Sequence, residues 1–237
     1  MIVFDGRSIL LDVEGTTSSI SFVHDVLFAH AKRHVGDFLA ARGDDPDVRA
    51  VAAGLAATAG LDATVLDSPE GLTRLAYAAV EMMNRDLKDT ALKSLQGMIW
   101  RGAYEAGEVR SHVFDDVPPA LRQWADAGLD VRIYSSGSVE AQKLFFAHTT
   151  AGDLTPLLRG HYDTATGPKR EAASYGRIAA DMGLEPRQIL FVSDVGAELD
   201  AAHTARMATA LAVRPGNGDP GGIFDHEPVA SFAEIVT

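Results

Sequence analysis

Two carboxylates and a group of hydroxyls follow the first predicted strand of this chain. The apolar stretch Ser8–Leu11 leads into Asp12 and Glu14, which are separated by one residue, and glycine, threonine and serine residues come directly afterwards. An aspartate can attack phosphorus and form an aspartyl-phosphate, which divides a hydrolysis into two easier steps. A second acid two residues away can protonate the leaving oxygen and later deprotonate the attacking water. The pair could therefore take part in phosphoryl transfer, with an aspartate as the phosphoryl acceptor and Glu14 as the acid–base.

Three further polar groups come later in the chain, two of them at the ends of predicted strands and one, Lys169, at the start of a predicted helix. The hydroxyls and backbone N–H groups of Ser135 and Ser136, ahead of a predicted helix, suit a phosphate. Lys169 could neutralise charge on the group being transferred. Asp194 could join Asp12 in holding Mg²⁺, which usually takes one or two carboxylates with waters and phosphate oxygens. Each group alone is more simply a cap, a loop or a solvated lysine, but the four in strand–loop order favour one site.

The elements that carry these residues alternate between strand and helix. The predicted strands are nearly continuous apolar runs, as expected of parallel strands covered on both faces. The strands are Ser8–Val13, Leu129–Ser135, Gln188–Ser193 and, more weakly, Thr209–Arg214, and the helices are Pro118–Ala127, Val139–Phe146, Lys169–Met182 and Glu198–Arg206. This order predicts a doubly wound, mainly parallel α/β sheet. Ligands bind beyond the carboxyl ends of such strands, so the four groups should meet at one edge.

A long stretch with helical periodicity interrupts this alternation after the first strand. It predicts an α/β catalytic core of residues 1–21 and 108–237, with a helical cap insertion over 22–107. His30 and His34 share a helix face but lack the glutamate of a HExxH zinc motif, so they are predicted to be solvated. One helix face is predicted to close over a substrate tail or, equally, to be a salt-bridged face with a buried tryptophan. Its residues are Lys93, Gln96, Trp100 and Arg101.

Composition argues against several classes of partner. The 237 residues include 33 acidic and 21 basic side chains, a net charge of −12, and such a surface repels the phosphate backbone of nucleic acids. No apolar run is long enough to cross a bilayer, and the N-terminus lacks a signal-peptide pattern. The absence of cysteine fits a reducing cytosol. We therefore expect a cytoplasmic monomer that takes a small phosphorylated substrate and binds neither nucleic acid nor membrane. Arg214–Gly222 is expected to be a surface loop.

The order of the motifs resembles that of a known superfamily. DxE-GT, SS-G, K and SD, in that order, is the signature of the haloacid dehalogenase superfamily of phosphatases. The chain is most similar to its enolase-phosphatase family of methionine salvage, in which a glutamate typically replaces the second aspartate. The resemblance spans nearly the whole chain, and it rests on "LDVEGTTSSISFVHDVLFAHA", "LKSLQGMIWRGAYEAG", "IYSSGSVEAQKLFF", "TGPKREAASYGRIA" and "FVSDVGAELDAAHTARM".

The resemblance implies a Mg²⁺-dependent enzyme with a haloacid dehalogenase-like core and an inserted helical cap. Members of this family enolise 2,3-diketo-5-methylthiopentyl-1-phosphate and then hydrolyse its phosphate to release an acireductone. By resemblance, Asp12 is the nucleophile and a metal ligand. Glu14 is the acid–base and contributes to the metal site through its backbone carbonyl, and Asp194 completes that site. The residues that would bind and steady the phosphate are Ser135, Ser136 and Lys169.

One position departs from the family pattern, and two alternatives for the function stay open. Where the family has Ala-Gly-Met, this chain has Ala205-Arg206-Met207, which bears on a helix end and not on the chemistry. No motif marks the base that takes the proton from carbon during enolisation. The first alternative is a haloacid dehalogenase-type phosphatase or phosphomutase for another small phosphomonoester. The second is a non-catalytic Mg²⁺-binding phosphoacceptor module of the receiver type.

Overall fold

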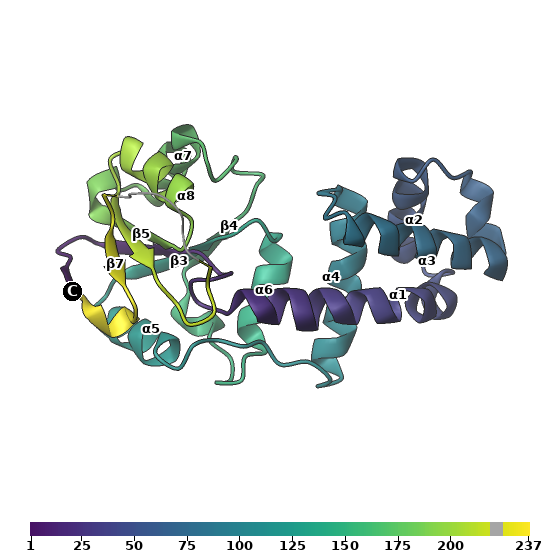
Figure 1. Cartoon of the computed structure of the whole chain (residues 1–237), viewed down its shortest axis with the longest axis horizontal. Coiled ribbons are helices and arrows are strands. Elements are labelled where there is room, and N and C mark those ends of the chain that lie inside the picture. The colour runs from purple at the N-terminus through teal and green to yellow at the C-terminus, as the bar shows by residue number, and fades with distance from the viewer. Residues whose placement is uncertain (219–224) are drawn as a thin grey trace. The chain divides into compact units, whose positions relative to one another are not determined.

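The computed structural model describes residues 1–218 and 225–237, which form two compact units (Figure 1). One unit comprises Met1–Phe22 and Arg110–Thr237, and the other comprises Val23–Val109. Part of the predicted surface loop Arg214–Gly222 lies outside the described residues. Within the described ranges, no helix is long and apolar enough to cross a membrane.

A six-stranded parallel sheet forms the centre of the first unit, with strand order β4-β3-β2-β5-β6-β7. The strands are β2 (Ser8–Leu11), β3 (Asp130–Tyr134), β4 (Gly160–Tyr162), β5 (Ile189–Ser193), β6 (Ala208–Ala212) and β7 (Glu227–Val229). The predicted doubly wound parallel sheet is confirmed. Its central strand β2 pairs with both β3 and β5, so the carboxyl ends of these three strands lie side by side.

Burial on both faces explains why these strands read as continuous apolar runs. In β2, Ile9, Leu10 and Leu11 are all fully buried. Leu10 packs with Phe191 of β5 against α7 (Ala172–Met182) and α8 (Gly196–Thr204). Figure 1 shows these two helices on one side of the sheet and α5 (Val117–Asp126) on the other. The remaining helix of this unit that bears on the site is α6 (Val139–Ala147).

The sheet also contains strands that the sequence did not predict. β4 and β7 are three residues each, and β7 includes Pro228, which a sheet tolerates at its edge. Separate from the main sheet, β1 (Ile2–Val3) pairs in parallel with β8 (Ile235–Val236). Runs of two or three residues are too short to show a period, so only their tertiary partners identify them as strands.

The second unit is helical throughout. Its elements are a π-helix (Phe22–Phe28) that begins at the last residue of the first unit, α1 (Ala29–Arg42), α2 (Pro46–Thr58), a 3₁₀ turn (Ala63–Asp67), α3 (Pro69–Asn84) and α4 (Thr90–Glu105). The side chains of Asp45, Ser68 and Asp89 accept backbone hydrogen bonds at the starts of α2, α3 and α4. Fully buried leucines from all four α-helices, Leu39, Leu55, Leu75 and Leu95, give this unit a core of its own.

The prediction that His30 and His34 are solvated is wrong for His30. Only 7% of His30 is exposed, and its ring stacks on that of His34 with centroids 4.2 Å apart. Burial and the neighbouring His34 lower the pKa of His30, so the stacked ring is favoured in its neutral form.

The end of α8 shows the backbone conformation of Arg206, the position where the family pattern predicts glycine. Arg206 has a φ of 69°, in the left-handed region that arginine rarely adopts. Its N–H donates to the His203 carbonyl at 2.8 Å, and the Met207 N–H donates to the Ala202 carbonyl at 3.0 Å. These two bonds are those of a Schellman motif, which favours glycine at the position of Arg206.

Arg206→Gly is therefore expected to raise the free energy of unfolding by about 1 kcal/mol. Arginine in this conformation costs ~1–2 kcal/mol, and the greater freedom of glycine in the unfolded chain offsets part of that gain. Gly183 ends α7 with a φ of 65°, so Gly183→Arg is the reverse exchange and should lower stability by a similar amount. Urea unfolding followed by circular dichroism checks both. Unchanged midpoints in both variants would contradict the backbone explanation.

Candidate active site

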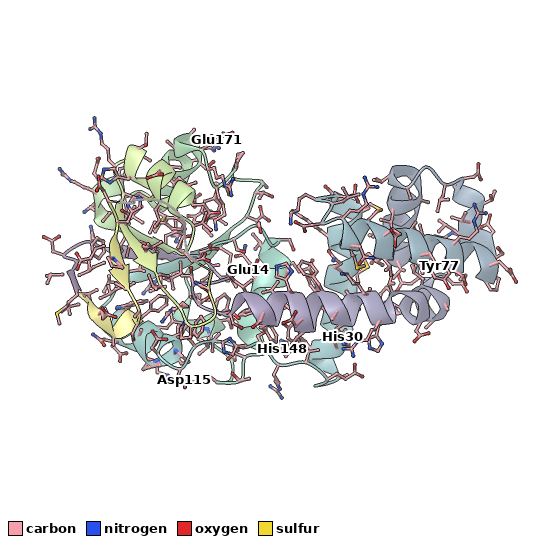
Figure 2. All side chains as sticks on the ribbon, viewed as in Figure 1. Glu14, His30, Tyr77, Asp115, His148 and Glu171 are labelled. Carbon is pink, nitrogen blue, oxygen red and sulfur yellow. The ribbon has the colours of Figure 1, made fainter. Side chains whose placement is uncertain are left out.

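Asp12 lies at the carboxyl end of β2 and is held there by backbone and side-chain bonds. Its N–H donates to the Val192 carbonyl at 3.0 Å, which continues the pairing of β2 with β5 by one residue. The carboxylate accepts the Val13 N–H at 2.8 Å, and only 5% of the residue is exposed. Glu14, labelled in Figure 2, is half-buried in the turn that follows.

The hydroxyls after Asp12 hold this turn in shape. Thr16, Thr17 and Ser18 are fully buried. The Thr17 hydroxyl lies 3.2 Å from the carbonyls of both Asp12 and Val13. The Thr16 hydroxyl accepts the N–H of Asp194 at 3.0 Å, which ties the turn to the end of β5. The Thr16 and Thr17 hydroxyls therefore support the backbone around the two acids.

The Asp194 carboxylate lies directly over Gly15. A Cβ at that glycine would come within 2.1 Å of the Asp194 carboxylate oxygen, and Gly15 has a φ of 72°. Both observations require glycine at this position. The turn therefore allows the carboxylates of two neighbouring strand ends, those of Asp12 and Asp194, to approach one another.

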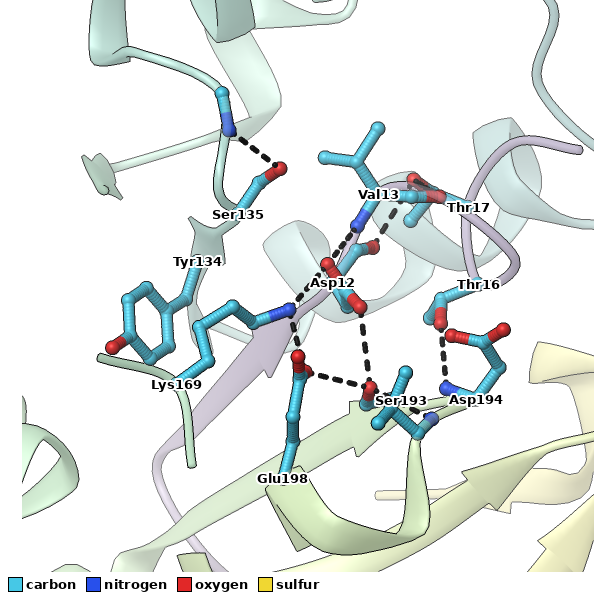
Figure 3. Close-up of polar contacts among 12 residues, drawn as sticks. Asp12, Val13, Thr16, Thr17, Tyr134, Ser135, Lys169, Ser193, Asp194 and Glu198 are labelled. Atoms are coloured by element: carbon cyan, nitrogen blue, oxygen red, sulfur yellow. Dashed lines mark hydrogen bonds and ion pairs between the residues drawn. The ribbon is translucent and has the colours of Figure 1, made fainter. Parts of the chain in front are cut away.

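Lys169 joins Asp12 to a second buried acid. Its ammonium nitrogen lies 2.7 Å from a carboxylate oxygen of Asp12 and 2.6 Å from one of Glu198 (Figure 3). The Ser193 hydroxyl lies 3.2 Å from the other Asp12 oxygen and 3.1 Å from Glu198. Because a hydroxyl has one hydrogen, Ser193 donates to one of these acids at a time. The site is thus a buried cluster of acids held around one lysine.

The charges of this cluster are strongly coupled. Burial disfavours the charged form of Lys169, but the adjacent Asp12 and Glu198 outweigh it and raise its pKa, so the ammonium stays charged at neutral pH. Burial, and then the negative charge of Asp12, raise the pKa of Glu198. The same two causes, in the same order, raise the pKa of Asp194 to about 7. Asp194 therefore lacks enough nearby positive charge to stabilise its carboxylate.

These donors fit Mg²⁺. The carboxylates of Asp12 and Asp194, with the Glu14 backbone carbonyl that the family resemblance implies, would supply only hard oxygen ligands, which this ion prefers. A cation beside Asp194 would also offset the repulsion that raises its pKa. Among the described residues there is no cluster of three or more histidine, cysteine, aspartate or glutamate side chains arranged for a metal. Mg²⁺ needs no such cluster, because waters and phosphate oxygens complete its shell.

The predicted phosphate-binding serines lie in the turn between β3 and α6. Ser135 follows the last residue of β3, and its N–H donates to the Tyr162 carbonyl of β4 at 3.2 Å. Its hydroxyl accepts the Gly137 N–H at 3.3 Å. Ser136 comes next in the same turn, ahead of the N-terminus of α6. The turn belongs to the strand next to β2, on the same edge as Asp12.

Lys169 does not open a helix as predicted, because α7 begins three residues later, at Ala172. Side-chain bonds replace helical ones in this segment. The Tyr175 hydroxyl donates to the Lys169 carbonyl at 2.7 Å, and the Ser174 hydroxyl donates to the Pro168 carbonyl at 2.8 Å. These bonds fold the segment back on α7 and direct the lysine toward Asp12.

Sequence reasoning missed several residues that shape the site. Glu198 stands in the first turn of α8, five residues after the end of β5, so its sequence position places it near this edge of the sheet, but its contact with Lys169 was not predicted. Arg214 is buried between the rings of Phe114 and Phe232, and its guanidinium carbon lies 4.9 and 4.3 Å from the two ring centroids. The Nε of Arg214 donates to the Thr16 carbonyl at 2.9 Å. Two further bonds complete this support, from Arg214 to Asp116 at 2.7 Å and from Asn217 to the Gly15 carbonyl at 2.7 Å. Only tertiary contacts reveal that Arg214 and Asn217 support the turn after Asp12.

Comparisons with known proteins agree with this geometry. A family model described as haloacid dehalogenase-like hydrolase matches residues 7–206. The chain is 48% identical over 216 residues to enolase-phosphatase E1 of Sorangium cellulosum, covering 91% of each chain. It is 46% identical over 230 residues to enolase-phosphatase E1 of Pseudomonas aeruginosa strain UCBPP-PA14, covering 97% and 98%. The solved structure of the UTR4 protein of Saccharomyces cerevisiae has a TM-score of 0.81 at 33% identity, covering 96% of this chain and 98% of that one.

The chain therefore belongs to the haloacid dehalogenase-like hydrolases. The parallel α/β fold described above agrees with that class. Within that class the chain is a member of the enolase-phosphatases. The predicted superfamily, family and phosphatase activity are confirmed.

Proposed function

We propose that this protein converts 2,3-diketo-5-methylthiopentyl-1-phosphate to the acireductone in methionine salvage, by enolisation followed by Mg²⁺-dependent hydrolysis of the phosphate. The observation that carries the proposal is the buried Asp12, paired with Lys169 at 2.7 Å on the carboxyl edge of the sheet. This ion pair occurs in a chain of which 97% aligns with a relative named enolase-phosphatase E1.

Asp12 and Glu14 divide the hydrolysis into two displacements. A carboxylate oxygen of Asp12 attacks phosphorus while the bond from phosphorus to the substrate oxygen breaks, and Glu14 gives its proton to that oxygen. Glu14, now ionised, takes a proton from the water that attacks the aspartyl-phosphate. Inorganic phosphate then leaves, and Asp12 is restored. Lys169 carries a positive charge beside the ionised Asp12, because the two acids that contact it hold its pKa above the usual range.

Two sets of residues hold the substrate's phosphate and the cofactor. Ser135 and Ser136 bind the phosphate through the turn that precedes α6. Asp12, Asp194 and the Glu14 carbonyl hold Mg²⁺. When bound, the ion offsets the negative charge of the phosphate and polarises the substrate carbonyl for enolisation.

Removal of the metal tests this assignment. Turnover of the diketo-phosphate is expected to stop in EDTA and to return with added Mg²⁺, because the acids of the site and the phosphate repel one another without a cation. Phosphate release should be measured before and after the addition, with Na⁺ at equal ionic strength as control. Full activity in a demonstrably metal-free sample would contradict the assignment of a Mg²⁺ site to these residues.

The predicted cap, residues 22–107, is our proposal for the part that selects the substrate. Of its predicted substrate-facing residues, Gln96 is buried and Trp100 donates to the Leu27 carbonyl at 2.8 Å, so these two serve the packing of their own unit. We further propose that the protein acts as a cytoplasmic monomer, in keeping with its net charge of −12 and the lack of cysteine.

A further inference from the structure

The N-terminus of α6 has fewer available donors than a helix usually offers to a phosphate. The Val139 N–H donates to the Asp163 carboxylate at 3.1 Å. The Ala141 N–H donates to the hydroxyl of Ser138, the capping residue, at 3.2 Å. Protein oxygens thus occupy the first and third N–H groups of the helix. Donors for a phosphate must come mainly from the turn before it, residues 135–138, which we call the phosphate loop.

A buried glutamine fixes the conformation of this loop. Only 3% of Gln142 is exposed, and its Nε2 lies 2.8 Å from the Gly137 carbonyl and 2.8 Å from the Tyr162 carbonyl. Two carbonyl acceptors can be satisfied only by the NH₂ group, so the orientation of the amide follows from its partners. Its Oε1 then faces Nδ1 of His161 at 3.2 Å, which must carry the hydrogen. Every polar atom of Gln142 is therefore engaged.

The state of His161 agrees with this orientation. Burial, and then the charge of Lys143, lower the pKa of His161 to about 4. The ring is therefore neutral at physiological pH, and it has one N–H to give, the one that Gln142 accepts.

Gln142 and the Tyr162 carbonyl together hold both ends of the phosphate loop. The same carbonyl that accepts from Gln142 also accepts the Ser135 N–H at 3.2 Å, so the entrance of the loop is fixed as well as the Gly137 carbonyl near its exit. All peptide bonds are trans, and in a trans peptide the C=O and the following N–H point in opposite directions. The Ser138 N–H is therefore turned away from Gln142. Within residues 1–218 and 225–237, it donates to no protein acceptor.

We propose that Gln142 is a positioning residue for phosphate binding: its amide holds the Gly137–Ser138 peptide so that the Ser138 N–H is directed at the substrate's phosphate. The inference rests on the proposed function of the loop as the phosphate site. It adds a backbone donor to the serine hydroxyls and assigns the residue that orients it.

Two substitutions separate this role from general packing. Gln142→Met keeps the length of the side chain but has no N–H, and Gln142→Glu places acceptor oxygens against two carbonyls. For Gln142→Met we expect KM and the inhibition constant for inorganic phosphate to rise together by about tenfold, as for the loss of one hydrogen bond. We expect kcat to change by less than about threefold, because Asp12 and Lys169 are untouched. Gln142→Glu should weaken phosphate binding further. The control Gln123→Met, on the exposed face of α5, should leave all three constants unchanged.

A measurement on the unaltered protein keeps the proposal testable if these variants do not fold. In a titration of ¹⁵N-labelled protein with inorganic phosphate, the Ser138 amide is expected to shift strongly. Two results would overturn the positioning role of Gln142 and leave the proposed function standing. One is an active wild-type enzyme whose Ser138 amide signal does not shift with phosphate. The other is a folded Gln142→Met variant with an unchanged inhibition constant for phosphate. A Ser138 shift in a protein that hydrolyses no phosphomonoester would support the loop and count against the proposed function.

Discussion

Asp12→Asn is expected to lower phosphate release by at least about a thousandfold while the protein remains folded. An amide is a poor nucleophile toward phosphorus and a poorer Mg²⁺ ligand than a carboxylate. The fold should persist because Lys169 keeps its ion pair with Glu198 at 2.6 Å, so no buried charge is left unpaired.

Single-turnover phosphate release and circular dichroism together measure this effect. Asp115→Asn is the matched control, because it makes the same exchange at an exposed aspartate of the same unit that takes no part in the proposed chemistry. It should retain full activity. A folded Asp12→Asn protein with substantial turnover would remove the nucleophile assignment.

Glu14→Gln is expected to separate the two halves of the reaction. Glutamine keeps the shape and hydrogen-bonding capacity of glutamate but cannot give or take a proton at neutral pH. Hydrolysis should slow by about a hundredfold or more, since the leaving oxygen loses its proton donor. Enolisation needs a base close to the substrate's carbon atoms, whereas Glu14 is placed two residues after the nucleophile, for the phosphoester oxygen. The enol-phosphate should therefore accumulate.

Enol absorbance and free phosphate, recorded in parallel, distinguish the outcomes for Glu14→Gln. Loss of both signals would mean that Glu14 is the base for both steps, contrary to our expectation. Normal phosphate release would show that Glu14 has no part in the hydrolysis. Glu70→Gln, an exposed exchange of the same kind in α3, serves as control.

The sheet could be predicted because its central strands are buried on both faces. Ile9, Leu10 and Leu11 leave no exposed position in β2, and every residue of β5 is buried, so both read as parallel strands. Parallel strands end at one edge, which is why residues as far apart in the chain as Asp12 and Lys169 could be assigned to one site from their sequence positions.

The contacts that hold the site together could not be predicted in the same way. Glu198 follows the end of β5 by five residues, but only the fold shows that it contacts Lys169. Arg214 and Asn217 act on backbone carbonyls about two hundred residues earlier in the chain. No local pattern encodes such pairs, because a carbonyl acceptor is present at every residue. The same holds for Gln142, whose amide donates to backbone atoms.

The most direct test of the central claim is to incubate the purified wild-type protein and Mg²⁺ with 2,3-diketo-5-methylthiopentyl-1-phosphate, and to follow enol absorbance and phosphate release in one sample. We expect the enol signal to appear first and phosphate to follow it, with the total phosphate equal to the substrate consumed. Release of phosphate from simple phosphomonoesters, with neither enol nor phosphate formed from the diketo-phosphate, would contradict the proposed function.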